Sequence, residues 1–197
     1  MAAGMAPAAS LSIAMGAGIA QCTLGLATVA PFLVHRIITG RWSRRGLPLL
    51  PDSVDTMPFI SLVLPTWNEG LIIEGKMADI AAQEYPRESL EVIVIDAASD
   101  DDTVERVRDW LSRNADDPIA NRFRIIEEEE RAGKSVSINL AFEAATEEAE
   151  VLMMSDVDCR LSPGALMHVG RRFLDDSIGA VTGRQVILNP DVSQKTE

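Results

Sequence analysis

The chain has 197 residues, of which 47% are hydrophobic, and it carries a formal net charge of −12 at pH 7. This length suits one domain of ordinary size with an appendage. Residues 1–50 contain four Arg and no Asp or Glu, so the remaining residues hold 14 basic and 30 acidic side chains. Such an acidic body argues against nucleic acid as a partner, because that binding depends on Lys and Arg contacts to phosphates. Two distant cysteines, Cys22 and Cys159, form neither a disulfide framework nor a zinc motif.

Residues 11–34 contain no charged side chain. As a helix this stretch would be about 36 Å long at roughly 1.5 Å per residue, enough to cross the hydrocarbon core of a bilayer. A cleaved signal peptide is one alternative, but it requires basic residues before its apolar core, and the first Lys or Arg is Arg36. A buried helix of a soluble protein is another, but that helix would have a polar face. We therefore expect residues 1–40 to form a transmembrane anchor.

All four early arginines follow this apolar stretch, at positions 36, 41, 44 and 45. Because basic residues favour the cytoplasmic side of a membrane, we expect the N-terminus outside and the rest of the chain in the cytoplasm. The predicted location is the cell membrane, crossed once by this chain. Residues 41–58 hold basic residues and three prolines and are expected to form a linker.

From residue 59 onward, short apolar segments alternate with segments of helical periodicity. Strands are expected at 59–65, 90–96, 122–128, 150–156 and 178–188, and helices at 69–83, 101–113, 133–145 and 162–176. This alternation is typical of an α/β domain with a mostly parallel sheet and helices on both faces. In such sheets, ligands bind at the carboxyl ends of the strands.

Polar clusters follow four of these expected strands, where their carboxyl ends should meet. They are Pro65 to Glu69, Asp96 to Asp101, Gly133 to Ser135, and the pair Asp156 and Asp158. Their convergence on one edge of the sheet predicts a binding site more strongly than any single cluster does.

The segments SLVLPTWNEG, EVIVIDAASDDDT, RAGKSVSINLAF and LMMSDVDCRLSPGAL resemble, in order and spacing, those of the family 2 glycosyltransferases with the GT-A, Rossmann-like fold. The resemblance covers roughly residues 59–190. It is greatest to the membrane-bound, inverting branch that includes cellulose, hyaluronan and poly-N-acetylglucosamine synthases. It implies transfer of a sugar from a nucleoside-diphosphate sugar, with UDP favoured, to a polysaccharide or lipid acceptor.

Asp156 and Asp158 match the DxD motif of that family, which implies a Mg²⁺ or Mn²⁺ cofactor. The chemistry agrees, because a divalent cation held by carboxylates stabilises the charge of a departing diphosphate. Two solvated loop acids are the alternative. By the same resemblance, Lys134 lies near the diphosphate, although a lone loop Lys is usually only solvated.

Pro65, Thr66, Asn68 and Glu69 match the stretch that lines the nucleoside pocket in this family, and Asp96 matches the acid that contacts the uracil base. For each there is a purely structural alternative. Asp96 would then be a turn or helix-capping residue, and Asn68 and Glu69 would cap the following helix. Trp67, where the family usually has Tyr or Phe, is expected to be a packing aromatic.

The catalytic base of the family and its QxxRW motif have no counterpart in this sequence. The resemblance therefore implies that residues 59–197 are a donor-binding half whose acceptor half is absent or belongs to a partner chain. Activity of the isolated chain stays open. The alternative is a non-catalytic nucleotide-sugar-binding or assembly subunit of a membrane complex.

Overall fold

The computed structural model describes residues 6–42, 56–184 and 186. The chain divides into two compact units, Met1–Leu49 and Leu50–Glu197. Most of the predicted linker, together with Arg44 and Arg45, lies outside the described residues.

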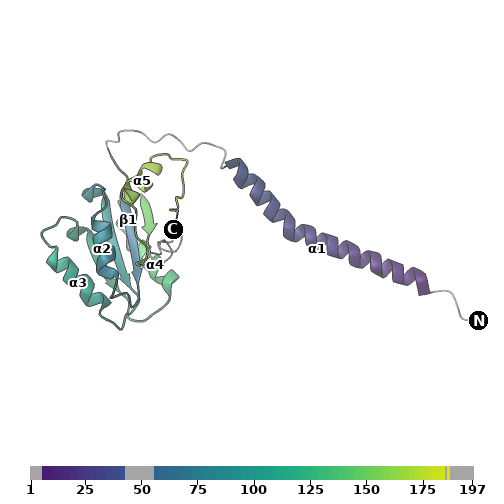
Figure 1. The fold of residues 1–197 in the computed structure, drawn as a ribbon, viewed down its shortest axis with the longest axis horizontal. Coiled ribbons are helices and arrows are strands. Elements are labelled where there is room, and N and C mark those ends of the chain that lie inside the picture. Colours follow the sequence, from purple (N-terminus) through teal and green to yellow (C-terminus); the bar gives the residue numbers. More distant parts are fainter. Residues whose placement is uncertain (1–5, 43–55, 185, 187–197) are drawn as a thin grey trace, which may run out of the picture. The chain divides into compact units, whose positions relative to one another are not determined.

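The first unit is helix α1, which runs from Ala6 to Trp42 (Figure 1). Its segment Met15–Arg41 is long and apolar enough to cross a membrane. The hydroxyl groups of Thr23 and Thr28 donate to backbone carbonyls four residues earlier, at 2.8 and 3.0 Å. These bonds satisfy both hydroxyl groups within the helix, which is compatible with a lipid environment. The prediction of one N-terminal helix able to span a membrane is confirmed.

The second unit is built on a parallel sheet. Its strands are β1 (Ile60–Thr66), β2 (Leu90–Asp96), β3 (Phe123–Glu127) and β4 (Val151–Met154). They lie in the order β3-β2-β1-β4, and every pair is parallel. The predicted parallel sheet is confirmed, since near-continuous apolar strands of this kind are stable only with both faces covered.

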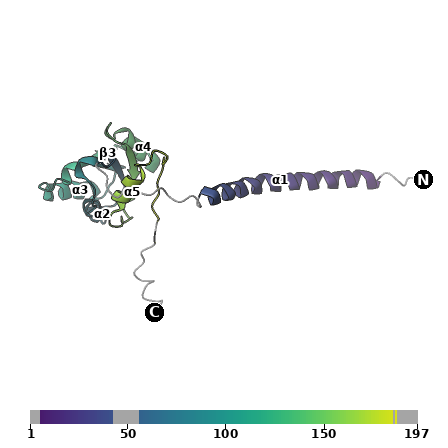
Figure 2. The same cartoon turned by 90° about the horizontal axis from the view of Figure 1, so that it is seen from above.

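Three α-helices and two short 3₁₀ segments connect these strands, and a further helix follows β4. They are α2 (Ile73–Ala81), η1 (Arg87–Ser89), α3 (Thr103–Arg113), η2 (Ala120–Arg122), α4 (Lys134–Glu143) and α5 (Ala165–Arg172). Helices α2, α3 and α5 cover one face of the sheet, whereas α4 covers the other (Figures 1 and 2).

The larger core lies beneath α2, α3 and α5. Alternate residues of the two central strands point into it, because side chains of a strand alternate between its faces. This core contains Ile60, Leu62, Leu64, Leu90, Val92 and Val94 from the strands and Ile73, Met77, Ile80, Val107, Trp110 and Leu166 from the helices. The ring of Trp110 lies 5.3 Å from that of Phe123, which ties α3 to the edge strand β3.

The smaller core lies beneath α4. Val63, Ile93 and Ile95 pack against Ala141 of this helix. Helix α4 covers β1 and β2 but not the edge strand β4, whose Leu152 and Met154 remain 49% and 44% exposed. The prediction of helices on both faces is confirmed, with β4 less covered than the strands at the centre.

The strand predicted at residues 178–188 is absent from the part of that range that the structure describes. Residues 178–184 and 186 are not in a strand, while 185, 187 and 188 lie outside the described residues. A strand needs a paired neighbour as well as an apolar composition, and Val181 and Val186 are exposed rather than packed. The helix expected from residue 162 begins only at Ala165, because Gly164 adopts a left-handed conformation at φ +72°.

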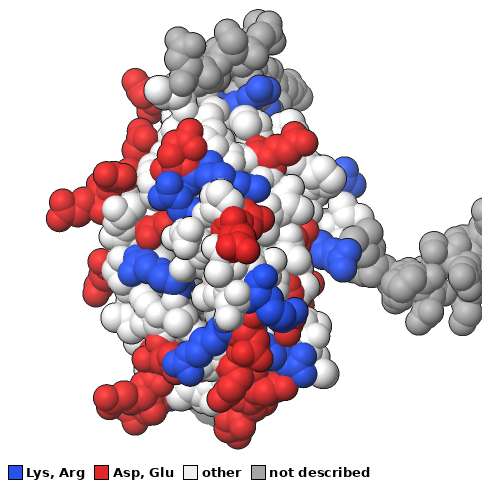
Figure 3. All heavy atoms as spheres, turned by 90° about the vertical axis from the view of Figure 1, so that its left-hand side faces the viewer, with Lys and Arg blue, Asp and Glu red and all other residues white. Residues whose placement is uncertain are grey.

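The surface of the second unit carries mixed charge. On the face shown in Figure 3, basic side chains are interspersed with acidic ones and form no continuous basic patch. Several basic side chains of the domain are paired with acidic ones, among them Arg108 with Glu127 and Arg113 with Glu74, each with an N–O distance of 2.5 Å. Exposed pairs of this kind contribute little to stability.

Because α4 buries β2 but leaves β4 partly exposed, we predict different losses of stability at these two strands. Ile93→Ala should lower the free energy of unfolding by about 2–5 kcal/mol, because it leaves a cavity under α4. Leu152→Ala, on the same face of the sheet but half exposed, should cost less than about 1 kcal/mol. Urea unfolding of the detergent-solubilised chain measures both. Equal losses would mean that Leu152 is as buried as Ile93.

Candidate functional site

The site lies where the strand order reverses. The chain runs outward from β1 through β2 to β3 and then returns to β4 on the other side of β1. The loop after β1 leads to α2 and the segment after β4 leads to α5 on the same face of the sheet, whereas the loop after β3 leads to α4 on the other face. In sheets of this kind, ligands bind at the carboxyl ends of the strands near such a reversal of strand order. Met154 pairs with Val63, so Asp156 follows close to the level of Pro65 on β1.

Asp96 organises the loop that follows β2. Its carboxylate is buried, with 2% of the residue exposed. It accepts hydrogen bonds from the Thr66 hydroxyl at 3.0 Å and from the Ser99 amide and hydroxyl at 2.8 and 2.6 Å. Asp96 is therefore a turn residue, which was the structural alternative in the sequence analysis. Through its bond to Thr66 it also joins the end of β2 to the end of β1.

Asn68 cross-links the same two loops. Its side-chain amide donates to Asp100 Oδ1 at 2.6 Å and accepts from the Asp100 backbone N–H at 3.0 Å. The Asn68 N–H donates to the Ser99 hydroxyl at 2.8 Å. Its φ of +54° is a left-handed conformation that Asn tolerates better than most residues.

Helix α2 is not capped by either of the side chains proposed as caps. Its N-cap residue is Ile72, which makes no side-chain capping bond. Glu69 contributes only its backbone carbonyl, which accepts the N–H groups of Ile72 and Ile73 at 3.0 Å each. The capping alternative is wrong, and the side-chain amide of Asn68 is bonded to Asp100 instead.

Glu69 faces the acids that follow β4. The pKa of its carboxyl is raised, first by burial and then by the negative charges of Asp158 and Asp101, while Lys134 acts in the opposite direction. Glu69 is therefore influenced by charges that follow β2, β3 and β4. The site therefore gathers several carboxylates with one nearby ammonium group.

The segment after β4 presents both aspartates on the surface side. Val157 between them is buried, whereas Asp156 is partly exposed and Asp158 is exposed. One carboxylate oxygen from each aspartate and the sulfur of Cys159 lie within 4.8 Å of one another. Carboxylate oxygens are the kind of donor that Mg²⁺ and Mn²⁺ prefer. Cys159 was not among the predicted ligands, because no cysteine-rich metal motif pointed to it.

Lys134 lies beside this pair. It is the first residue of α4, preceded by Gly133 with a φ of +104°. Its ammonium group is 2.5 Å from Asp156 Oδ1, and the ion pair is partly exposed. The structure thus brings together Lys134 and Asp156, which lie 22 residues apart in the sequence.

Trp67 is not the packing aromatic that we expected. Its residue is 41% exposed, and the guanidinium of Arg131 lies 3.5 Å from the ring centroid. This cation–π contact joins the loop after β1 to the loop after β3. Pro65, also predicted as a site residue, lies half-buried in β1 opposite Ile95.

Sequence reasoning missed Lys76, which is buried on α2 beneath the segment that carries the aspartates. A signal was present, because Lys76 shares the apolar face of this helix with Ile73, Met77 and Ile80. A charged residue in such a stripe indicates a buried partner.

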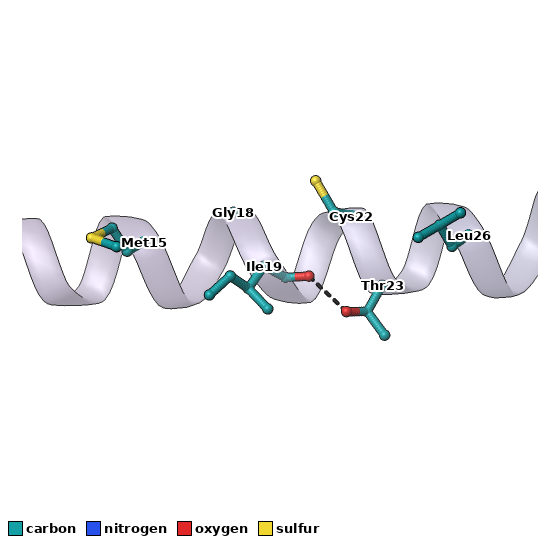
Figure 4. Close-up of a pocket in the computed structure, with 6 residues that line it drawn as sticks. All are labelled: Met15, Gly18, Ile19, Cys22, Thr23 and Leu26. Atoms are coloured by element: carbon teal, nitrogen blue, oxygen red, sulfur yellow. Dashed lines mark hydrogen bonds between the residues drawn. The ribbon is translucent and has the colours of Figure 1, made fainter.

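A hollow on α1 is not part of this site. It is an apolar groove along a single helix (Figure 4), lined by Met15, Gly18, Ile19, Cys22, Thr23 and Leu26. Thr23 supplies its polar group, and that hydroxyl already donates to the Ile19 carbonyl at 2.8 Å. Such a surface lacks the polar groups that would orient a nucleotide.

Comparisons with known proteins agree with this arrangement. Glycosyltransferase AglE of Haloferax volcanii is 28% identical over 133 residues, which are 68% of this chain and 38% of that protein. Hyaluronan synthase of Streptococcus pyogenes is 27% identical over 152 residues, 75% of this chain and 35% of that protein.

Among solved structures, the mannosyltransferase PcManGT from Pyrobaculum calidifontis, in complex with GDP-Man and Mn²⁺, is 31% identical with a TM-score of 0.62. The match covers 80% of this chain and 44% of that one. The chain thus spans less than half the length of each of these three relatives. The likeness in structure confirms the expected GT-A type of fold. The model of the family described as glycosyl transferase family 2 matches residues 61–196, so the chain belongs to that family.

Proposed function

We propose that the chain is the donor-binding part of a membrane-anchored, inverting glycosyltransferase. Its donor is a nucleoside-diphosphate sugar, with UDP favoured, and its acceptor is a polysaccharide or lipid. The observation that carries the proposal is the meeting of Asp156, Asp158 and Lys134 at the point where the strand order reverses. In this proposal residues 1–40 are the anchor, 41–58 the linker and 59–197 the nucleotide-sugar-binding domain.

The diphosphate end of the donor is assigned to the loops after β3 and β4. Asp156 and Asp158 would hold Mg²⁺ or Mn²⁺, which when bound stabilises the negative charge of the departing diphosphate. The relative PcManGT was crystallised with Mn²⁺, which supports a cation in this family. The chain itself supplies Lys134, whose ammonium lies at the start of α4, where backbone N–H groups also favour an anion.

Lys134 and Asp156 neutralise each other in the structure. We infer that donor binding exchanges these partners, so that Lys134 turns to the diphosphate and Asp156 to the cation. The acidic site would otherwise repel an anionic donor. The positive charge of Lys134 is already present in the site before the donor binds.

The nucleoside end is assigned to the loops after β1 and β2. Pro65, Thr66, Asn68 and Glu69 line this side, and Asp96 is the proposed contact to the base. Asp96 already accepts three hydrogen bonds, so the loop is organised before any ligand arrives. A pre-organised loop binds without a further cost in conformational entropy.

The acceptor and the catalytic base are assigned to polypeptide outside residues 1–197, either on the same protein or on a partner chain. The similarity to hyaluronan synthase supports a polysaccharide acceptor and the membrane-bound branch of the family. The apolar helix α1 supports the anchor, with the N-terminus outside and the binding domain in the cytoplasm.

The cation site makes the first test. Calorimetric titration of UDP and of GDP into the detergent-solubilised chain should show binding that depends on Mn²⁺ or Mg²⁺, with UDP preferred. Asp156→Asn together with Asp158→Asn should abolish the metal-dependent part. The exposed pair Asp116→Asn and Asp176→Asn removes the same charge elsewhere and should leave binding unchanged. Equal effects of the two double variants would argue against a cation site at Asp156 and Asp158.

The role of Lys134 makes the second test. Lys134→Met should weaken binding of UDP by about tenfold or more, because a hydrogen bond between charged groups is worth about 1.5–3 kcal/mol. Binding of uridine, which has no phosphate, should stay unchanged in the same variant. Titration by NMR measures both ligands. A parallel loss of uridine binding would show that the substitution damages the whole pocket.

The orientation makes a third test. A fluorescent protein fused after residue 197 should be active, because it folds in the cytoplasm. Alkaline phosphatase fused at the same position should be inactive, because it is active only outside the cytoplasm. The chain should also stay with the membrane during carbonate extraction. Active alkaline phosphatase at the C-terminus would contradict the proposed orientation.

A further inference from the structure

We propose that Lys76 is a positioning residue, which holds the segment 155–161 in the shape that binds the divalent cation. We call this segment the carboxylate loop, because it carries Asp156 and Asp158. The inference rests on the proposed function. It concerns a residue that contacts neither cation nor donor in that proposal and that acts through the backbone and side chains around the two aspartates.

The ammonium group of Lys76 is bonded to both sides of the aspartate pair. It donates to the Ser155 hydroxyl at 2.8 Å and to the Cys159 carbonyl at 2.5 Å. Ser155 directly precedes Asp156, and Cys159 directly follows Asp158. One buried group thereby fixes the distance between the two ends of the segment that bears the carboxylates.

Asp79 extends this attachment. It lies one turn after Lys76 on α2, with its Oδ2 atom 3.7 Å from the ammonium nitrogen. The same oxygen accepts the backbone N–H of Leu161 at 2.8 Å. The carboxylate loop is therefore held by α2 at Ser155, Cys159 and Leu161.

Burial makes Lys76 an unusual choice for this position. Its side chain is 1% exposed and lies on the helix face that carries Ile73, Met77 and Ile80. Taking an ammonium group out of water is costly, and an apolar residue of similar volume at such a position is often neutral or stabilising. Packing alone therefore does not account for a lysine here.

The charges of Asp156 and Asp158 explain why a lysine is buried at position 76. Their carboxylates repel each other, and a loop free to move would separate them in the absence of a cation. Burial lowers the pKa of the Lys76 ammonium, while the charges of Asp79 and Asp156 act against that shift. A positive charge below the loop thus favours the paired arrangement, and residues that orient metal ligands in this way strongly affect metal affinity.

Gln83, just after the end of α2 at Ala81, provides a matched control. It is also buried, and it also bonds to the chain that follows β4, through the Ser162 carbonyl at 3.3 Å and the Leu166 N–H at 3.4 Å. These contacts lie beyond the carboxylate loop. Gln83→Met therefore removes a comparable buried link to this region, from the turn that follows α2, without touching the aspartate pair.

The experiment measures Mn²⁺ binding by the full-length, detergent-solubilised chain in the presence of UDP, from the electron paramagnetic resonance signal of free Mn²⁺. Lys76→Met should raise the Mn²⁺ dissociation constant by about 10- to 100-fold, whereas Gln83→Met should change it by no more than about twofold. Amide hydrogen exchange of residues 155–161 should become faster in Lys76→Met and not in β1 or β2. The melting temperature of Lys76→Met should not fall below that of Gln83→Met.

Three outcomes would overturn the inference, and they are distinguishable. Unchanged Mn²⁺ affinity in Lys76→Met, with tight binding by the wild type, refutes the role of Lys76 and leaves the proposed function intact. Equal weakening by Gln83→Met shows a general structural effect. Absence of Mn²⁺ binding by the wild type refutes the proposed function itself. If Lys76→Met does not fold, Lys76→Gln, which keeps a hydrogen-bond donor, should still weaken Mn²⁺ binding.

Discussion

The pairing of β1 with β2 on one side and with β4 on the other is the constraint on which the rest of the domain depends. This register aligns Thr66 with Asp96, and Asp96 with Glu127, along one edge of the sheet. It also delivers the segment after β4 to the same edge, because Met154 pairs with Val63. Backbone hydrogen bonds thus bring together polar residues that are up to about ninety positions apart. The cores under α2, α3, α5 and α4 stabilise this register, since a slip by one residue would turn every apolar side chain to the wrong face.

The loops at this edge are held by polar side chains rather than by apolar packing. Asp96 accepts from Thr66 and Ser99, Asn68 is paired with Asp100, and Lys76 is bonded to Ser155 and Cys159. Buried polar groups add stability only when all of their bonds are made. Networks of this kind make a loop rigid in one shape, which suits the binding of a polar ligand by pre-organised groups.

Electrostatics sets the second demand on the site. The domain is strongly acidic, and burial, followed by the charges of Asp158 and Asp101, raises the pKa of the Glu69 carboxyl. A site of this kind would repel a diphosphate unless positive charge is added. Lys134 supplies one such charge, and a divalent cation between the aspartates would supply more. The acidic character and the proposed cation dependence are therefore parts of one physical argument.

The sequence by itself determined the kinds of element and predicted which polar residues lie at one edge of the sheet. Uninterrupted apolar runs such as Leu90–Asp96 predicted buried parallel strands, and the acids and the lysine after them predicted a site at one edge. These features are local, because they depend on composition and spacing along a short stretch. The strand expected at 178–188 shows the limit of that reasoning, since an apolar run forms a strand only where a neighbour pairs with it.

The tertiary structure alone decided which groups touch. The ion pair of Lys134 with Asp156, the stacking of Arg131 on Trp67 and the bonds of Lys76 to the carboxylate loop each join separate loops or elements. No local pattern encodes such contacts, because they follow from the register of the sheet and the placement of helices on its faces. Whether a lysine is solvated or buried is likewise a property of the packed domain. For that reason the sequence could predict Lys134 as a site residue, whereas the role proposed for Lys76 came only from the folded chain.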